Sequence, residues 1–378
     1  MIYRHPLHCI LPPYMLRNIY TNSSGERQKA ALAAIVSSAR LRGQREAAPA
    51  LADVAPAAAA SGGKDRRVYS ADHGSELPGR LVRQEGEPAS SDAAVNEAYD
   101  GAGSTYDLFW EAYQRDSLDD GGMRLESTVH YQQAYDNAFW DGKQMVYGDG
   151  DGDLFNRFTL AVDVIGHELT HGITQFTSNL NYSGQPGALN ESFSDVFGSL
   201  VKQWQRGQTA SEADWLVGQG LFTDKVDGVA LRSMKEPGTA YDDPILGKDP
   251  QPSHMRDYVV TLEDHGGVHI NSGIPNHAFF LTAVAMGGRA WERAGRIWYV
   301  AGRDKFETST DFQRAANLTF EAAAELYGSG SAEQQAVQYG WESVGIKIGA
   351  GTAVQPAANG CATVPISAAR SLLRRIGL

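Results

Sequence analysis

The spacing of apolar residues changes along this chain, and the changes predict where helices and strands lie. Residues 14–42 carry apolar side chains among polar ones at a spacing that fits a helix. From about residue 66 to residue 160, short apolar runs alternate with turn-forming residues, which is typical of strands. Farther along, helical periodicity recurs over 162–177, 188–206, 273–288, 290–301, 309–326 and 331–344. An α+β fold follows, with a strand-rich first lobe and a mainly helical second lobe.

Composition shifts divide the chain into four parts. Residues 47–63 are rich in Ala, Pro and Gly, which cannot bury a core, so they predict an exposed linker that proteases can cut. The last thirty residues are again rich in Ala and Gly, and predict a tail that frays or docks on a partner. The expected parts are a propeptide and linker, a β-rich lobe that includes the helix at 162–177, a helical lobe and a tail: 1–62, 63–177, 178–347 and 348–378.

The overall composition is that of a globular protein, with 42% hydrophobic, 10% aromatic and 21% charged residues. Cys9 and Cys361 lie near opposite ends, so no disulfide framework is implied. No apolar run approaches the roughly twenty residues of a membrane span. The first residues also lack the apolar region and cleavage site of a secretory signal. We therefore expect export by a route without an ordinary signal peptide, with a cytoplasmic location as the alternative.

Charge is unevenly distributed between the N-terminal segment and the rest. Residues 1–67 carry ten Lys and Arg against four Asp and Glu, a net of +6, whereas the other residues carry 23 against 41, a net of −18. A basic segment beside an acidic body predicts an intramolecular cover. The alternative is a basic tail that contacts nothing. An acidic body also argues against nucleic acid as a partner.

Residues 167–171 read His-Glu-Leu-Thr-His, a pattern typical of a zinc site. On a helix, His167 and His171 share a face and can bind one ion, while Glu168 is offset and can act as a general base. Nineteen residues after His171, Asn190-Glu191 offers a third ligand. Two imidazoles and a carboxylate with one open position form the ligand set of a hydrolytic zinc site. The alternative is a helix whose histidines only pack or face water.

Other polar residues suit the same chemistry. Asp195 lies four residues after Glu191 on the same helix face, and can orient a ligand imidazole, although an ordinary surface acid is the alternative. His269 follows a Gly-Gly pair and precedes a predicted helix. It can donate to an oxyanion, with Asp264 fixing its tautomer.

These motifs resemble the thermolysin family of zinc metallopeptidases, also called bacillolysins or neutral proteases. The resemblance runs from about residue 66 to Lys347, through the motifs at 137–140, 145–152, 167–171, 190–191, 231–234 and 266–269. The sequence Pro-Pro-Tyr-Met-Leu at 12–16 resembles protealysin-type precursors, a subgroup with a short propeptide and no ordinary signal sequence. The resemblance implies a two-lobed, monomeric endopeptidase made as a zymogen, with the zinc helix at the cleft between the lobes.

The resemblance also implies a role for each matching residue. One zinc ion would be held by His167, His171 and Glu191, with Asn190 and Asp195 beside them. Glu168 would be base and later proton donor. The oxyanion would be bound by Tyr182 and His269, the latter oriented by Asp264. The substrate backbone would be held by Asn137, the Ala138 carbonyl and Arg232. A pocket for the bulky apolar residue after the cut would be lined by Phe155, Val164, Val217 and Leu231.

The sequence departs from the family at its paired calcium site. Asp163 and Asp214 remain, but the other acidic positions read Lys202, Leu216 and Gln219. An ammonium at this place removes ligand charge and can pair with the two aspartates, so calcium binding is doubtful.

Two further features leave alternatives open. The Cys9 thiolate could fill the open zinc position and silence the precursor, or Cys9 could be an ordinary small buried residue. Residues 149–153 carry three aspartates but lack the later Gly and Glu of a calcium-binding loop, and so predict a surface turn.

The sequence thus predicts a zinc endopeptidase acting on proteins and peptides, whose N-terminal segment is cut within residues 45–67. A catalytically silent or inhibitor-held binding protein on a peptidase scaffold is the alternative from another class, and an aminopeptidase is the alternative among enzymes. A silent protein should lack at least one of Glu168, Tyr182 or His269, and all three are present.

Overall fold

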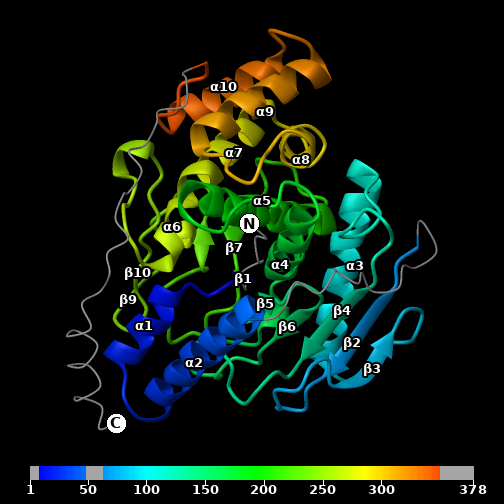
Figure 1. The fold of residues 1–378 in the computed structure, drawn as a ribbon, viewed down its shortest axis with the longest axis vertical. Coiled ribbons are helices and arrows are strands. Elements are labelled where there is room, and N and C mark those ends of the chain that lie inside the picture. Colours follow the sequence, from blue (N-terminus) through cyan, green and yellow to red (C-terminus); the bar gives the residue numbers. More distant parts are fainter. Residues whose placement is uncertain (1–7, 48–62, 350–378) are drawn as a thin grey trace.

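The computed structural model describes residues 8–47 and 63–349, and it confirms the two-lobed α+β architecture (Figure 1). Helices α7 to α10 lie at one end, the main sheet lies at the other, and α4 and α5 lie between them. The predicted linker and tail fall largely on residues 48–62 and 350–378, outside the described residues, so the predicted boundaries stay predictions.

The first lobe is built on a sheet with the strand order β1-β5-β6-β4-β2-β3. Strand β4 pairs in parallel with β2 on one side and with β6 on the other. The pairs β2–β3, β5–β6 and β1–β5 are antiparallel. The edge strand β1 comes from the N-terminal segment. The bounds are β1 His8–Cys9, β2 Arg66–Ser70, β3 Arg80–Gln84, β4 Leu125–Val129, β5 Ala138–Trp140 and β6 Met145–Tyr147.

A long helix, α3 (Ala93–Tyr113), lies within the region for which the sequence predicts strands, so that prediction was wrong for these residues. Glycines within the helix weaken its helical signal, because glycine disfavours helix interiors. They are needed for packing: a Cβ on Gly101 would lie 2.4 Å from Ile165, and one on Gly103 would lie 2.2 Å from Arg66. Tertiary packing thus overrides the local preference.

The N-terminal segment forms two helices, α1 (Pro13–Asn22) and α2 (Gly25–Ala47), where the sequence predicts one helical run. Helix α1 lies beside β9 and β10, with Asn18 donating to the Leu246 carbonyl at 2.8 Å (Figure 1). Helix α2 contacts the first lobe, where Ser37 donates to Gln132 at 3.0 Å. The segment therefore contacts residues of both lobes.

The second lobe follows the predicted series of helices. Within the described ranges, no helix is long and apolar enough to cross a membrane. The helices of the second lobe are α5 Gly184–Arg206, α6 Asp264–Asn271, α7 Gly273–Met286, α8 Ala294–Asp304, α9 Phe312–Tyr327 and α10 Ala332–Ser343. The shorter elements of this lobe are β7 Leu216–Val217, β8 Arg232–Ser233, β9 Asp242–Asp243, β10 Gly247–Lys248 and η2 Met255–Asp257, while η1 Phe158–Leu160 belongs to the first lobe.

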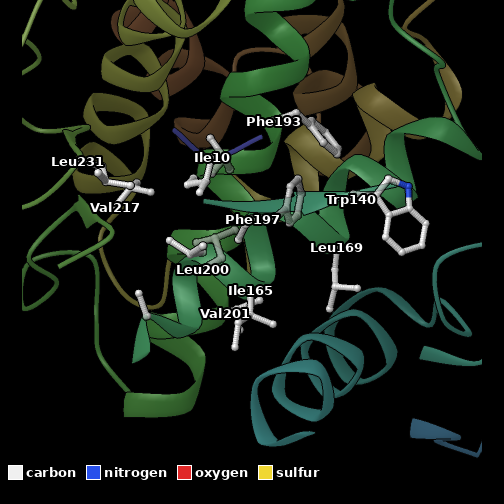
Figure 2. Close-up of a cluster of buried hydrophobic side chains, with 14 of the residues drawn as sticks. Ile10, Trp140, Ile165, Leu169, Phe193, Phe197, Leu200, Val201, Val217 and Leu231 are labelled. Carbon is white, nitrogen blue, oxygen red and sulfur yellow. The ribbon is translucent and has the colours of Figure 1, made fainter. Parts of the chain in front are cut away.

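Helix α4 (Val162–Gln175) packs against α5 at unusually close range. A Cβ on Gly198 would lie 2.3 Å from the Asp163 carbonyl oxygen, and one on Gly166 would lie 3.1 Å from the Gly198 Cα. Only glycine permits this approach of two helix backbones. Figure 2 shows the apolar side chains of the two helices in one cluster beside it, among them Ile165 and Leu169 of α4 and Phe197, Leu200 and Val201 of α5.

Candidate zinc centre and substrate site

The three predicted zinc ligands meet at the α4–α5 contact. His167 and His171 come from α4 and Glu191 from α5, and one ligand atom of each lies within 4.8 Å of the others. The two Nε2 atoms are 3.1 Å apart, and each lies 3.5 Å from a carboxylate oxygen of Glu191. All three side chains are buried.

The outer nitrogen of each imidazole is held by a neighbour. His167 Nδ1 lies 2.8 Å from Asp195 Oδ1, and His171 Nδ1 lies 2.8 Å from Asn190 Oδ1 and 3.0 Å from Ser194 Oγ. Ser194 was not predicted, although it lies one helical turn after Asn190. Both Nε2 atoms are thereby turned toward the shared point, which fits the way proteins orient zinc-binding histidines.

The buried ligand set fits zinc chemically. The Glu191 Oε2 atom is buried and accepts no hydrogen bond from the described residues, so it is available to a cation. Two imidazoles and one carboxylate are ligands of hydrolytic zinc sites.

Asp195 is fixed from several sides. Arg232 donates to its two oxygens through Nε at 2.9 Å and Nη2 at 2.8 Å, and Asn276 donates to Oδ2 at 2.9 Å. Burial alone would raise the pKa of Asp195, but Arg232 and His167 hold it well below its usual range. Asp195 is therefore an anion that can orient His167. Asn276 carries no motif signal, and only the fold reveals it.

The Glu168 side chain contacts strand β5 of the sheet. Its Oε2 accepts a hydrogen bond from the Trp140 backbone N–H of β5 at 3.0 Å. Burial, together with repulsion from Glu191, raises the pKa of Glu168 well above its usual value. A carboxylate with raised proton affinity is suited to take up a proton from a reacting group.

His269 and Tyr182 lie beside the zinc ligand Glu191. The Tyr182 hydroxyl donates to Glu191 and lies 3.4 Å from His269 Nε2. His269 Nδ1 lies 2.7 Å from Asp264 Oδ1. Burial disfavours a charged imidazole, but Asp264 and Glu191 raise the pKa of His269 to about 9. His269 lies in the short helix α6 and, as predicted, precedes the helix expected over 273–288, which is α7.

The N-terminal segment runs along β5 beside this centre. Cys9 pairs antiparallel with Phe139, and the next backbone N–H groups continue the pattern. Ile10 N donates to the Ala138 carbonyl at 3.1 Å, and Leu11 N donates to Asn137 Oδ1 at 3.0 Å. Asn137 and Ala138, two of the three residues predicted to hold a substrate backbone, therefore hold this segment.

The carbonyl groups of the same segment meet the other predicted residues. The Cys9 carbonyl oxygen lies 3.1 Å from His269 Nε2, and Arg232 Nη1 donates to the Ile10 carbonyl at 3.3 Å. The Cys9 side chain is buried, and a bond from its thiolate to zinc stays a prediction. The contact of the Cys9 carbonyl oxygen with His269 was not predicted.

The residues predicted to line the main pocket, and Ile10, all belong to the continuous buried core of the two lobes. Figure 2 labels Ile10 in this core with Val217 and Leu231, which are joined by a hydrogen bond from Leu231 N to the Val217 carbonyl at 3.0 Å. Val164 and Phe155 are fully buried in it as well. Their role as pocket lining stays a prediction.

Lys202 pairs with the two aspartates that remain of the expected calcium site. Its ammonium lies 2.8 Å from Asp163 Oδ2 and 2.9 Å from Asp214 Oδ1, and the Lys202 side chain is 3% exposed. The predicted ion pairs are therefore formed. Whether calcium binds stays a prediction.

The fold has two lobes, and its buried site combines two histidines of one helix, a glutamate between them and a second glutamate from the next helix. These features define a zinc metalloendopeptidase. Residues 58–175 match the model of the thermolysin metallopeptidase catalytic domain, and residues 178–346 match that of the thermolysin metallopeptidase alpha-helical domain. The chain belongs to the thermolysin family of metallopeptidases.

Individual proteins agree with this family. An "Extracellular metalloprotease" of Pectobacterium carotovorum subsp. carotovorum is 51% identical over 323 residues, which cover 85% of this chain and 92% of the relative. "Protease PrtS" of Photorhabdus sp. (strain Az29) is 48% identical over 324 residues, 84% of this chain and 87% of the relative. The solved structure described as the precursor of protealysin, a metalloproteinase from Serratia proteamaculans, has a TM-score of 0.82 and 49% identity, covering 90% of this chain and 99% of that chain.

Proposed function

We propose that this chain is a latent precursor, in which residues 1–62 act as an intramolecular inhibitor until the segment is cut from the peptidase within residues 45–67. The supporting observation is that Cys9, Ile10 and Leu11 contact the groups expected to hold a substrate. The likeness to a solved structure described as a precursor supports the same proposal.

The contacts also suggest a register for substrates. The carbonyl of Cys9 faces His269, one of the groups expected to stabilise the reacting oxygen, so it stands where the carbonyl of the cleaved bond would stand. Ile10 then occupies the place of the residue after the cut, and its side chain is fully buried. Cleavage on the amino side of bulky apolar residues follows from this register.

The other site residues have matching roles. Zinc bound by His167, His171 and Glu191 would supply a Lewis acid that polarises the substrate carbonyl and lowers the pKa of water. Glu168 takes a proton from the attacking water and later gives it to the leaving amine. His269 and Tyr182 donate hydrogen bonds to the carbonyl oxygen as it gains charge, and Asp264 orients His269.

The remaining groups position the substrate. Ala138 and Asn137 hold it antiparallel to β5, and Arg232 holds the carbonyl after the cut, as they hold residues 10 and 11 here. Positioning of this kind lowers the entropic part of the barrier. The name of the extracellular relative from Pectobacterium supports export of this enzyme, which we expect to be monomeric.

Mass-spectrometric mapping of cut sites on a denatured protein tests the function. The zinc-loaded, processed enzyme should cut before Leu, Phe, Ile and Val. Glu168→Ala should abolish the cuts while one zinc per chain remains, because Glu168 is not a ligand. Glu292→Ala, which removes an exposed glutamate from the second lobe, is the matched control and should cut normally. Absence of cuts by the processed enzyme, or equal cutting by Glu168→Ala, would contradict the proposal.

A further inference from the structure

A second group of metal-binding side chains lies in the first lobe. His73, His130 and Asp149 follow β2, β4 and β6, which are adjacent and parallel in the sheet. The carboxyl ends of parallel neighbours meet at one sheet edge, and one ligand atom of each residue lies within 4.8 Å of the others. We propose that these three residues bind a second metal ion, zinc or an ion of similar chemistry.

Backbone hydrogen bonds hold the loops of the two histidines together. His73 N donates to the His130 carbonyl at 2.9 Å, and Gln132 N donates to the Gly74 carbonyl at 2.9 Å. The φ angles of Asp72, His73 and His130 are 46°, 63° and 56°, a left-handed conformation that side chains other than glycine seldom adopt. Such strain persists only where the surroundings impose it, and it often marks functional sites. The two imidazole rings lie 5.5 Å apart as a result.

The hydrogen bonds of His130 match those of a metal-binding histidine. Its Nε2 lies 2.8 Å from Asp92 Oδ2, and Asp92 is itself fixed because its Oδ1 accepts from Ala94 N at 2.9 Å. A proton shared between Nε2 and Asp92 leaves the Nδ1 lone pair for an ion, which is the usual support of a zinc-bound imidazole. Nδ1 lies 2.9 Å from each oxygen of Asp149.

His73 completes the ligand set. Its Nδ1 lies 3.5 Å from Asp149 Oδ2, and its side chain is 49% exposed. Two imidazoles and one carboxylate favour zinc over calcium or magnesium, which prefer oxygen ligands. A cavity of about 370 Å³ reaches the group and is lined by Ser70, Asp72, His73, Arg80, Val82, Asp92 and His130.

An ion pair without metal is the competing explanation. An imidazolium of His130 between Asp92 and Asp149 would account for the short contacts, and it does not require the His73 imidazole. Two arginines near the group are held by other carboxylates: Arg80 by Asp72 at 2.8 Å, and Arg157 by Glu97. Removal of His73 therefore distinguishes the two explanations.

Zinc content after equilibrium dialysis of the full chain tests the proposal. The parent is Glu168→Ala, which retains the catalytic ligands and stays uncut, and the readout is independent of activity. At micromolar free zinc the parent should hold two ions per chain. His73→Ala and Asp149→Asn should each hold one. Asp72→Asn removes a charge from the same loop without removing a ligand, and should still hold two.

The result would overturn the proposal if the parent held one ion, or if both ligand variants still held two. If Asp72→Asn also lost the second ion, the ion would be attracted by the negative charge of the loop and not held by ligands. That result would also overturn the proposal. Metal-free melting curves that match the parent's exclude unfolding of the variants. Two ligand variants are used so that a folding defect in one leaves the other decisive.

Discussion

Replacement of Ile10 by alanine should weaken the hold of the N-terminal segment on the active site. Ile10 is 0% exposed, and truncation of such a residue to alanine costs about 2–5 kcal/mol. If that whole cost falls on the covered state, the ratio of covered to open precursor falls by about 30-fold to about 4,000-fold, since 1.4 kcal/mol is a factor of ten. The backbone contacts of Ile10 with Ala138 and Arg232 remain, so the segment should keep its register.

Peptide binding measures this change without interference from self-cleavage. In the Glu168→Ala background, the apparent affinity of the precursor for a labelled apolar peptide should rise by that factor when Ile10→Ala is added. Val36→Ala, at a 56% exposed position of α2, removes methyl groups from the same segment outside the core and should bind like the parent. Unchanged affinity in a folded Ile10→Ala precursor would refute the reasoning, provided that the processed Glu168→Ala enzyme binds the peptide tightly.

Three more substitutions test the packing and charge around the site. Lys202→Met leaves Asp163 buried without its cation, which costs about 3–5 kcal/mol and should lower the melting temperature by roughly 6–20 °C. Calcium or EGTA should leave the melting temperature of the wild type unchanged. A melting temperature of the wild type that depends on calcium would contradict the role assigned to Lys202. Gly198→Ala places a Cβ 2.3 Å from the Asp163 carbonyl, so calorimetry should show a loss of about 1–3 kcal/mol, and a neutral effect would argue against the close helix contact. Asp195→Asn should weaken zinc binding about 10-fold to 100-fold in a chelator competition, because His167 loses its charged partner; equal affinity in a folded variant would speak against that role.

The zinc ligands could be predicted because their arrangement is set by helix geometry. His167 and His171 are one turn apart on α4, and Glu191 and Asp195 are one turn apart on α5, so each pair shares a face in any helical context. The pairing of Lys202 with Asp163 and Asp214 was predicted because the family resemblance places all three at the expected calcium site, where an ammonium attracts two carboxylates. The two-lobed fold was also predictable, since the periodicity of apolar residues and the family resemblance agree on it.

Features that depend on packing between distant segments were not predictable. Helix α3 was missed because its glycines disfavour a helix locally, whereas the close packing of Ile165 against Gly101 requires one. Asn276 reaches Asp195 from 81 positions away. The spacing of residues along one chain does not encode such contacts.

The sequence alone determined the chemistry of this protein, because residue type and helical spacing decide which side chains can bind one zinc ion. Tertiary structure decided which distant segments contact the zinc ligands and the residues around them. The pairing of β1 with β5 places the Cys9 carbonyl beside His269, which lies 260 positions away. The order of β2, β4 and β6 brings His73 to Asp149. Strand order and register are set by burial of the whole sheet, and so these contacts exist only once the chain has folded.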